Sequence, residues 1–366
     1  MSFEEIEHIE ETDEVGKIND EEFHKAFEKR KKRNKIIKIS LLVVAVILGL
    51  MFINFLMEPK IGRKIIKDGN TYVVLENKSM FSSGKVELIQ TKDDEVFIPD
   101  TITVMERMTP DTFKVVAIYR EDVKGKSLHL PRYFEGFSSS YPLDEEISQS
   151  AITGDWYLEN IYVSEENEKY DSRDNCGCII DSETNTLLMS SNHAFIPNGI
   201  KAVAYNGLRR YFWGKETKFT IPDSIEVLDS LAFGCDFISI DDYVDEEVNN
   251  WRVDYLDFGS VKEIGYLAIY DSHLKNNATV ILPKTLEKID ASALCYSGRS
   301  AEFNIFYKGS EADWKRVRIL DNRLEVDELH LYKDPSPNFY YYSESEPEKK
   351  GKYWHFNNNN QPIVWN

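Results

Sequence analysis

Cysteine and histidine are scarce in this sequence. Its 366 residues include four cysteines and seven histidines, and this cysteine content is too low for a small scaffold stapled by disulfides. The histidines are scattered, and we find no His-Glu-x-x-His, no Gly-x-Ser-x-Gly and no glycine-rich phosphate loop. We therefore expect a protein that is not an enzyme and that has no cofactor or metal centre. An envelope enzyme with an unrecognised site is the alternative.

Two of the cysteines stand close together, as Cys176-Gly177-Cys178. Metal-binding and redox pairs are usually separated by two residues, and no second pair follows this one. We therefore favour buried, individually placed thiols over a metal or redox site. A bridge between Cys235 and Cys295 stays open from the sequence.

Basic residues are also in the minority, since 44 lysines and arginines face 63 aspartates and glutamates, for a net charge of −19. A strongly acidic surface argues against a nucleic-acid partner. The acidic stretch at residues 239–247 offers the oxygen ligands that calcium prefers. It lacks the Asp-x-Asp-x-Asp-Gly spacing of a preformed loop, so we favour a solvated insertion.

One long apolar segment runs from Ile36 to Met57 and is interrupted by Lys38, Ser40, Gly49 and Asn54. It is about as long as the ~20 residues that a helix needs to cross a bilayer, and we predict a transmembrane helix over 36–57. A secretory signal peptide is the alternative. However, the segment exceeds the usual apolar core of ~7–15 residues, and no small-residue cleavage site follows it.

Basic residues are distributed unevenly about this apolar segment. Seven flank or enter its N-terminal end, namely Lys29, Arg30, Lys31, Lys32, Arg33, Lys35 and Lys38. Four follow its other end, namely Lys60, Arg63, Lys64 and Lys67. Because basic residues are retained on the cytoplasmic side, we expect a cytoplasmic N-terminus and an extracellular remainder. We see no Leu-Pro-x-Thr-Gly sorting signal, so we expect attachment by membrane insertion.

Residues 1–35 are dense in glutamate and poor in apolar residues, which predicts a largely disordered cytoplasmic tail. Within it, residues 20–30 can form one or two helical turns that place Phe23 and Phe27 on one face. This face is either a docking site for a cytoplasmic partner or part of a frayed tail.

A repeated pattern occupies the second half of the chain. An apolar anchor has proline or phenylalanine three residues before it, another apolar residue three after it, and a small-plus-apolar pair at seven and eight after it. The four copies are Pro197, Ile200, Val203, Gly207-Leu208; Pro222, Ile225, Leu228, Ala232-Phe233; Phe258, Val261, Ile264, Ala268-Ile269; and Pro283, Leu286, Ile289, Ala293-Leu294.

The spacing of these copies indicates stacked units. The anchors Ile200 and Ile225 are 25 residues apart, as are Val261 and Leu286, and periods of ~20–50 residues are typical of solenoids. One coil is too small to bury its own apolar face, so neighbouring coils must do so. The small residue leaves room where coils approach most closely. Residues 97–102 and 130–134 resemble degenerate copies, and alternating residues at 64–94 suggest strands.

Further stretches carry a more specific pattern: residues 158–163, 170–176, 179–181, 184–188, 196–200 and 306–314, together with the tyrosines at 340–342 and the aromatic C-terminal segment. They resemble the BspA-like leucine-rich repeat family of bacterial surface proteins, over roughly residues 155 to 366 and more faintly 80 to 140. The resemblance implies a mainly β leucine-rich-repeat solenoid of short parallel strands, with ligand binding or adhesion as its function. It implies no catalytic residues.

The predicted organisation has six parts: a cytoplasmic tail at 1–35, the transmembrane helix at 36–57, a juxtamembrane stalk at 58–79, degenerate repeats or a β-rich cap at 80–155, leucine-rich repeats at 156–305 and a C-terminal segment and cap at 306–366. We expect a single-pass surface protein that binds a protein or glycan. A membrane-bound sensor that signals through its cytoplasmic tail is the alternative.

Two aromatic groups are candidate contact sites. Arg210, Tyr211, Phe212 and Trp213 lie between two repeat copies and combine the residue types that dominate binding hot spots. They form either a contact loop for the partner or a packing element on the back of the solenoid. The aromatic C-terminal residues can stack on sugars, but we favour a cap over the last coil.

Overall fold

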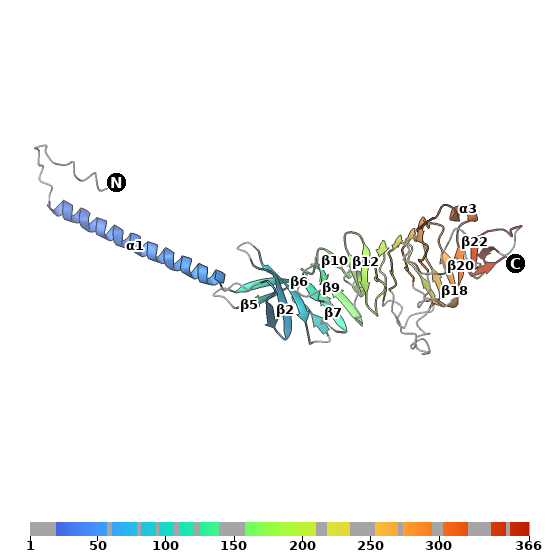
Figure 1. The fold of residues 1–366 in the computed structure, drawn as a ribbon, viewed down its shortest axis with the longest axis horizontal. Helices are drawn as coiled ribbons and strands as arrows, with labels where there is room; N and C mark the ends of the chain where they lie inside the picture. Colours follow the sequence, from blue (N-terminus) through green and yellow to red (C-terminus); the bar gives the residue numbers. More distant parts are fainter. Residues whose placement is uncertain are drawn as a thin grey trace, which may run out of the picture. The chain divides into compact units, whose positions relative to one another are not determined.

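The computed structural model describes residues 20–56, 61–78, 82–92, 95–105, 110–119, 125–138, 158–209, 218–234, 253–269, 274–294, 303–320, 338–348 and 352–365. The chain divides into two compact units. One comprises Met1–Glu58 with Met105–Pro110, and the other comprises Pro59–Val104 with Asp111–Asn366. The described residues are mainly β strands, preceded by one apolar helix near the N-terminus (Figure 1).

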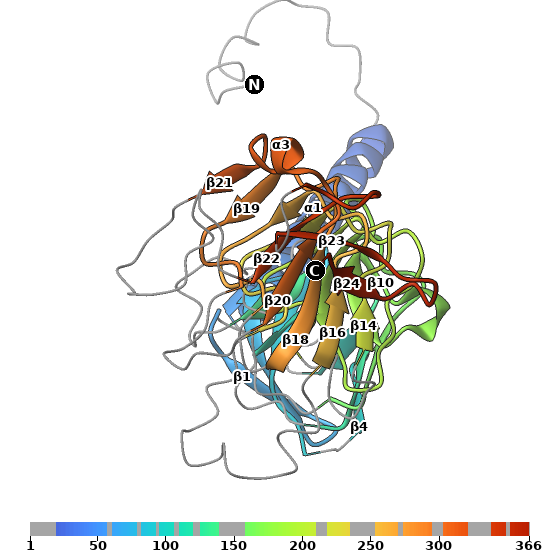
Figure 2. The same cartoon turned by 90° about the vertical axis from the view of Figure 1, so that its right-hand side faces the viewer.

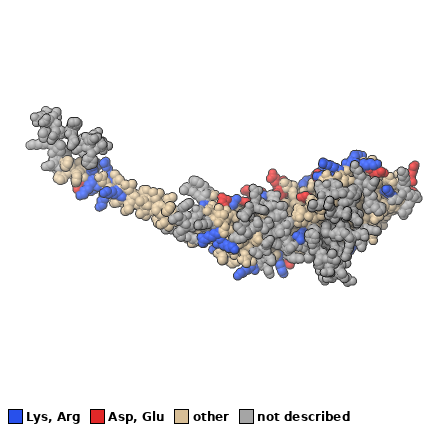
Figure 3. Space-filling model, viewed as in Figure 1, with Lys and Arg blue, Asp and Glu red and all other residues tan. Residues whose placement is uncertain are grey.

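The helix α1 spans Asp20–Leu56 and, among the helices that the structure describes, it alone is long and apolar enough to cross a membrane. The same length and composition suit a membrane anchor or a signal sequence. Its 37 residues rise ~1.5 Å each, so α1 exceeds the ~30 Å hydrocarbon core. Its lysines and arginines gather toward the N-terminal part (Figure 3).

The helix begins in the segment that we expected to be disordered. In its N-terminal part, Lys31 Nζ lies 3.8 Å from Glu28 Oε1. Opposite charges three or four residues apart stabilise an exposed helix. Phe23 and Phe27 are 61% and 55% exposed. Residues 20–30 are therefore helical, and α1 runs without a break into the apolar segment.

The described strands form four sheets, and the first, sheet A, has strand order β1-β2-β3-β6-β5, with β8 paired to β6. Its strands are β1 (Lys64–Lys67), β2 (Asn70–Glu76), β3 (Gly84–Gln90), β5 (Thr101–Val104), β6 (Asp111–Tyr119) and β8 (Gly136–Ser138). A tight turn at Asp68 and Gly69, with φ of 51° and 84°, joins β1 to β2. Both strands lie in the stretch that we predicted to be a stalk. This stretch folds as a hairpin because the turn pairs the two strands and because Tyr72 and Val74 are buried in the core.

Sheet B contains three parallel strands, β4 (Glu95–Phe97), β7 (Ser127–Leu130) and β9 (Asn160–Val163). Sheets A and B share one hydrophobic core, in which Val86, Leu128 and Ile161 are fully buried. The stretches that resemble degenerate copies therefore contribute to a β layer and to this core.

Sheet C follows the order β10-β11-β12-β13-β15-β17-β19-β21. Its strands are β10 (Tyr170–Asp171), β11 (Cys178–Asp181), β12 (Thr186–Ser190), β13 (Ala202–Val203), β15 (Val227–Leu228), β17 (Glu263–Ile264), β19 (Lys288–Asp290) and β21 (Arg318–Leu320). The first three pair antiparallel, the others parallel. The register joins Val203, Leu228, Ile264 and Ile289, so the four copies occupy equivalent places.

Sheet D has the order β14-β16-β18-β20-β22-β23-β24 and is parallel except for its last pair. Its strands are β14 (Lys218–Thr220), β16 (Val253–Asp257), β18 (Leu274–Leu282), β20 (Asn304–Tyr307), β22 (Phe339–Tyr342), β23 (Tyr353–Phe356) and β24 (Pro362–Val364). From β14 to β22 the chain visits sheets D and C alternately, and β14, β16, β18 and β20 lie side by side (Figure 2). The short helix α3 (Glu311–Trp314) follows β20 and begins with a Ser310–Asp313 capping box.

The repeat residues fill a core to which sheets C and D both contribute. Every position of the four copies is buried except Pro222, which is half-buried. The small residues lie at hydrogen bonds between coils, since the amide of Phe233 donates to the carbonyl of Ala268 at 3.1 Å and that of Ile269 donates to Ala293 at 3.1 Å. Successive repeat copies therefore lie in direct contact at this position.

Candidate partner-binding surfaces

The predicted contact residues Arg210, Tyr211, Phe212 and Trp213 lie outside the described residues. The acidic insertion at 239–247, Cys235 and Cys295 also lie outside them. Before the contact segment stands a turn of the first copy, and after it comes β14. The segment therefore connects sheet C to sheet D, and its role as a contact site stays a prediction.

The Cys176-Gly177-Cys178 thiols are buried and unbridged. The Cys178 thiol donates to the carbonyl oxygens of Phe195 at 3.6 Å and Cys176 at 3.7 Å. Hydrogen bonding from Cys178 lowers the pKa of Cys176 to about 7, although burial opposes this shift. Among the described residues no group of three or more His, Cys, Asp or Glu side chains could hold a metal ion. Both thiols are buried, as we expected, and they interact with each other through hydrogen bonding.

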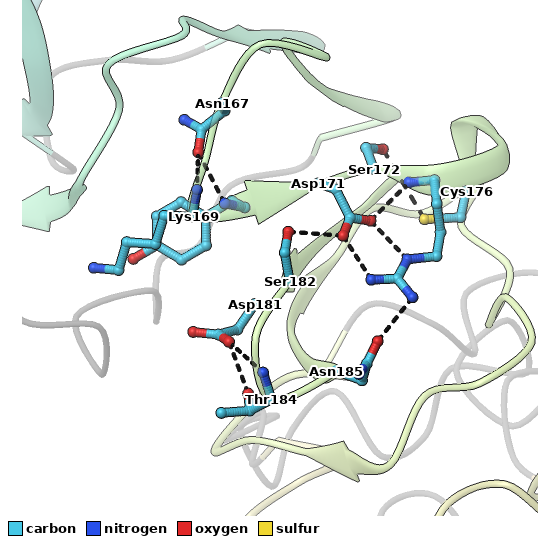
Figure 4. Close-up of polar contacts among 11 residues, drawn as sticks. Asn167, Lys169, Asp171, Ser172, Cys176, Asp181, Ser182, Thr184 and Asn185 are labelled. Atoms are coloured by element: carbon cyan, nitrogen blue, oxygen red, sulfur yellow. Dashed lines mark hydrogen bonds and ion pairs between the residues drawn. The ribbon is translucent and has the colours of Figure 1, made fainter.

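A polar network lies beside Cys176, whose Sγ is 4.0 Å from Ser172 Oγ (Figure 4). The Arg173 guanidinium forms a bidentate ion pair with Asp171, at 2.8 Å to Oδ1 and 2.6 Å to Oδ2, and donates to Asn185 Oδ1 at 2.8 Å. Ser182 Oγ donates to Asp171 Oδ2 at 2.9 Å. Burial tends to raise the pKa of Asp171, but the hydrogen bonds from Arg173 and Ser182 outweigh it and lower this pKa. The network links β10 to the turn between β11 and β12.

Asn167 has a similar structural role beside this network (Figure 4). Its Nδ2 donates to the carbonyl oxygens of Pro131 and Phe134, both at 3.1 Å. Its Oδ1 accepts from the amides of Lys169 at 2.9 Å and Tyr170 at 2.8 Å. One side chain thus holds two loops that are more than thirty residues apart, which explains the amide at this position without a ligand.

An aromatic row lies on the surface of sheet B. Phe97, His129 and Tyr162 occupy matching positions on β4, β7 and β9. The Phe97 and His129 rings stack with centroids 3.8 Å apart, and His129 stacks on Tyr162 at 4.5 Å. Burial lowers the pKa of His129, although the charge of Glu95 opposes this shift. Phe97 is 61% exposed, so this row offers apolar surface that we did not predict.

The C-terminal aromatic residues pack on sheet D. Trp354 is fully buried and its indole Nε1 donates to the Tyr307 carbonyl at 2.9 Å. Phe306 stacks on Tyr340 with ring centroids 5.2 Å apart, and Trp365 Nε1 donates to the Ser343 carbonyl at 3.0 Å. These contacts support the packing interpretation over sugar stacking for Trp354, whereas Tyr340 is only half-buried.

Charged side chains on or directly before neighbouring strands of sheet C form ion pairs. Glu226 accepts from Lys262 at 2.8 Å and from Lys201 at 3.3 Å, and Lys288 donates to Glu263 at 2.7 Å. Hydrogen bonds from Lys262 and Lys201 lower the pKa of Glu226. Each pair joins successive repeat copies, so these charges match one coil to the next.

One buried carboxyl group lies in sheet A. Glu87 on β3 has no exposed surface, and its Oε1 accepts a hydrogen bond from Ser138 on β8. Among the described residues no donor reaches its Oε2. Burial raises the pKa of Glu87 to about 7, outweighing the opposite effect of the Ser138 hydrogen bond. The carboxyl group therefore makes stability in this sheet depend on pH.

Comparisons with known proteins add little to this picture. No family model matches the chain, and no curated protein matches it. Among solved structures, the crystal structure of the pneumococcal vaccine antigen PcpA aligns over 73% of this chain and 100% of its own, with 14% sequence identity and a TM-score of 0.23. A TM-score this low supports no argument about fold or function.

Proposed function

We propose that this protein is anchored in a cell membrane by α1 and that its β unit is a BspA-like leucine-rich-repeat solenoid, which binds a protein or a glycan outside the cell. The register through Val203, Leu228, Ile264 and Ile289 carries this proposal, because repeated coils in register build a long, rigid face. The excess of basic residues before the apolar segment supports a cytoplasmic N-terminus.

Two segments are the proposed contacts. The segment Arg210, Tyr211, Phe212 and Trp213 connects two coils, and connections on a rigid scaffold are where binding residues gather. The aromatic row on sheet B, with Phe97 at its exposed end, is the second. Aromatic side chains supply much of the energy at protein interfaces.

To test this proposal, the full-length protein in nanodiscs is screened for binding to an array of purified surface glycans and extracellular proteins. We expect saturable binding, and we expect the double variant Tyr211→Ala with Trp213→Ala to weaken it by more than ~2 kcal/mol. If the melting temperature is unchanged, this result supports the segment as a contact site. Phe195→Ala with Tyr205→Ala is the matched control, because both side chains are exposed aromatics, at 44% and 40%. A lower melting temperature would make the segment a packing element, and no binding above empty nanodiscs contradicts the proposal.

A sensor is the second candidate function, and one observation favours it. Phe23 and Phe27 lie four residues apart on α1 and are more than half exposed, ahead of the apolar segment. A cytoplasmic partner could bind them as an amphipathic helix is bound. If deletion of residues 1–28 leaves surface display, binding and all cellular responses to binding intact, the sensor function is wrong.

A further inference from the structure

We propose that the edge formed by residues 61–67 binds the surface of an anionic lipid bilayer beside the point where α1 leaves it. This inference depends on the proposed membrane anchor and adds a second contact with the membrane, made by the folded β unit. Its evidence is the rigidity of the edge, its exposed isoleucines, its charge and its distance along the chain from α1.

The edge is held in a fixed conformation. β1 is the edge strand of sheet A, and four residue pairs join it to β2, from Lys64 with Val73 to Lys67 with Asn70. Hydrogen bonds extend this pairing toward the N-terminal end of the edge, since the Gly62 amide donates to the Val74 carbonyl at 2.8 Å and the Val74 amide donates to the Arg63 carbonyl at 3.0 Å. Side chains on residues 62–67 are therefore presented by a sheet and not by a flexible linker.

Two isoleucines on this edge are exposed. Ile66 is 78% exposed, more than any other large apolar side chain that the structure describes, including those of α1, and Ile61 is 68% exposed. Ile65 between them is buried and anchors the strand in the core. A neighbouring apolar phase would therefore gain contact with Ile61 and Ile66 without unfolding the strand.

The charge of this edge differs from that of the chain. Between Pro59 and Lys67 stand the four basic residues Lys60, Arg63, Lys64 and Lys67 and no acidic residue, although the whole chain has a net charge of −19. Arg63, Lys64 and Lys67 are exposed. Basic residues next to a membrane-spanning helix are attracted to anionic lipid headgroups, and isoleucines among them can enter the interface.

Chain length keeps the start of this edge, at Ile61, near the bilayer. Residues 36–56 of α1 rise ~32 Å, which matches the ~30 Å hydrocarbon core and would place Leu56 near its outer boundary. Ile61 follows Leu56 by five residues, and five residues reach at most ~18 Å. Ile61 therefore cannot leave the neighbourhood of the headgroups while α1 spans the membrane.

Protection of an edge strand is the competing explanation. Lysines on an edge strand prevent it from pairing with another chain, and this would account for Lys64 and Lys67. It does not account for an isoleucine that is 78% exposed between them. The two explanations differ in one observable, which is contact between Ile66 and lipid.

Photo-crosslinking of the full-length protein in vesicles measures this contact. A benzophenone amino acid replaces Ile66, and the control replaces Ile363, an isoleucine that is 40% exposed on β24. In vesicles of phosphatidylcholine with phosphatidylglycerol, we expect lipid adducts at position 66 to exceed those at position 363 by at least about fivefold. Vesicles of phosphatidylcholine alone, or Arg63→Gln with Lys64→Gln and Lys67→Gln, should lower the yield at position 66 by at least about threefold.

A matched variant separates local from general charge effects. Lys218→Gln with Lys284→Gln and Lys315→Gln removes three charges from exposed positions elsewhere, and it should leave the yield at position 66 unchanged. Equal adduct yields at positions 66 and 363 in inserted protein would overturn the inference and leave edge protection as the explanation. Protein that alkaline carbonate extracts from the vesicles would instead contradict the membrane anchor itself.

Discussion

Replacing Gly207 by alanine tests how closely the turn after β13 packs against β12 and against β13 itself. A Cβ atom at this position would lie 2.7 Å from the carbonyl oxygen of Leu187, 2.9 Å from Cγ1 of Val203 and 3.1 Å from the carbonyl oxygen of Ala204. The first two distances are shorter than real Cβ atoms adopt, and the third is tighter than most Cβ contacts. Two of these neighbours are backbone atoms in a hydrogen-bonded ladder, where the Ala204 amide donates to Leu187 at 2.9 Å. They cannot turn aside as a flexible side chain does.

The size of the effect follows from two opposing contributions. Overpacking of a close contact costs about 1–3 kcal/mol. Alanine in place of glycine restricts the unfolded chain, which returns about 0.4–1 kcal/mol. The steric contribution is larger, so we expect a net loss of about 1–2 kcal/mol. In a domain of this size each kcal/mol lowers the melting temperature by about 2–4 °C, and Gly207→Ala should melt about 2–8 °C below the parent.

Thermal unfolding of the full-length protein in nanodiscs, followed by near-ultraviolet circular dichroism, measures this difference. Gly49→Ala in α1 is the control, because a Cβ atom there meets nothing within 4 Å, and it should leave the β transition unchanged. A Gly207→Ala protein that melts at or above the parent temperature would refute this close packing of the turn after β13.

Two further predictions concern stability. Ala268→Trp and Ala293→Trp should each lower the melting temperature by more than Gly207→Ala does, because both alanines are fully buried at the small position of the repeat. The surface control Lys284→Trp should not lower it. If both alanine variants melt within about a degree of the parent, the repeat register is wrong. Burial raises the pKa of Glu87 to about 7, above the ~4.3 of an unfolded chain, so stability falls as pH rises between these values. Glu87→Gln should therefore raise the melting temperature more at about pH 8 than at about pH 5, and equal shifts at both would contradict this assignment.

The repeat register was predictable because it has a local physical cause. A coil that must bury its anchor against its neighbours repeats the same apolar spacing, and Leu228, Ile264 and Ile289 pair as that spacing requires. The burial of Cys176 and Cys178 was also predicted, because their spacing does not fit a metal site and unpaired thiols are usually buried.

The alternation at 64–94 predicted strands, and β1 and β2 lie there, whereas their hairpin turn and the aromatic row were not predicted, for different reasons. The Asp68-Gly69 pair is a strong hairpin signal, and its presence within 58–79 argues for β1 and β2 and against a stalk. The stack of Phe97, His129 and Tyr162 has no local signal, because each residue comes from a different strand more than thirty residues from the next. Only the register between β4, β7 and β9 brings these rings together.

The most direct test of the central claim is the accessibility of the chain in intact, wall-stripped cells. Protease added outside should degrade the part beyond residue 60 and spare a tag at the N-terminus, because α1 would hold the β unit outside the membrane and residues 1–35 inside. Loss of the N-terminal tag with survival of the β unit would reverse the orientation. That result would contradict recognition of a partner at the cell surface.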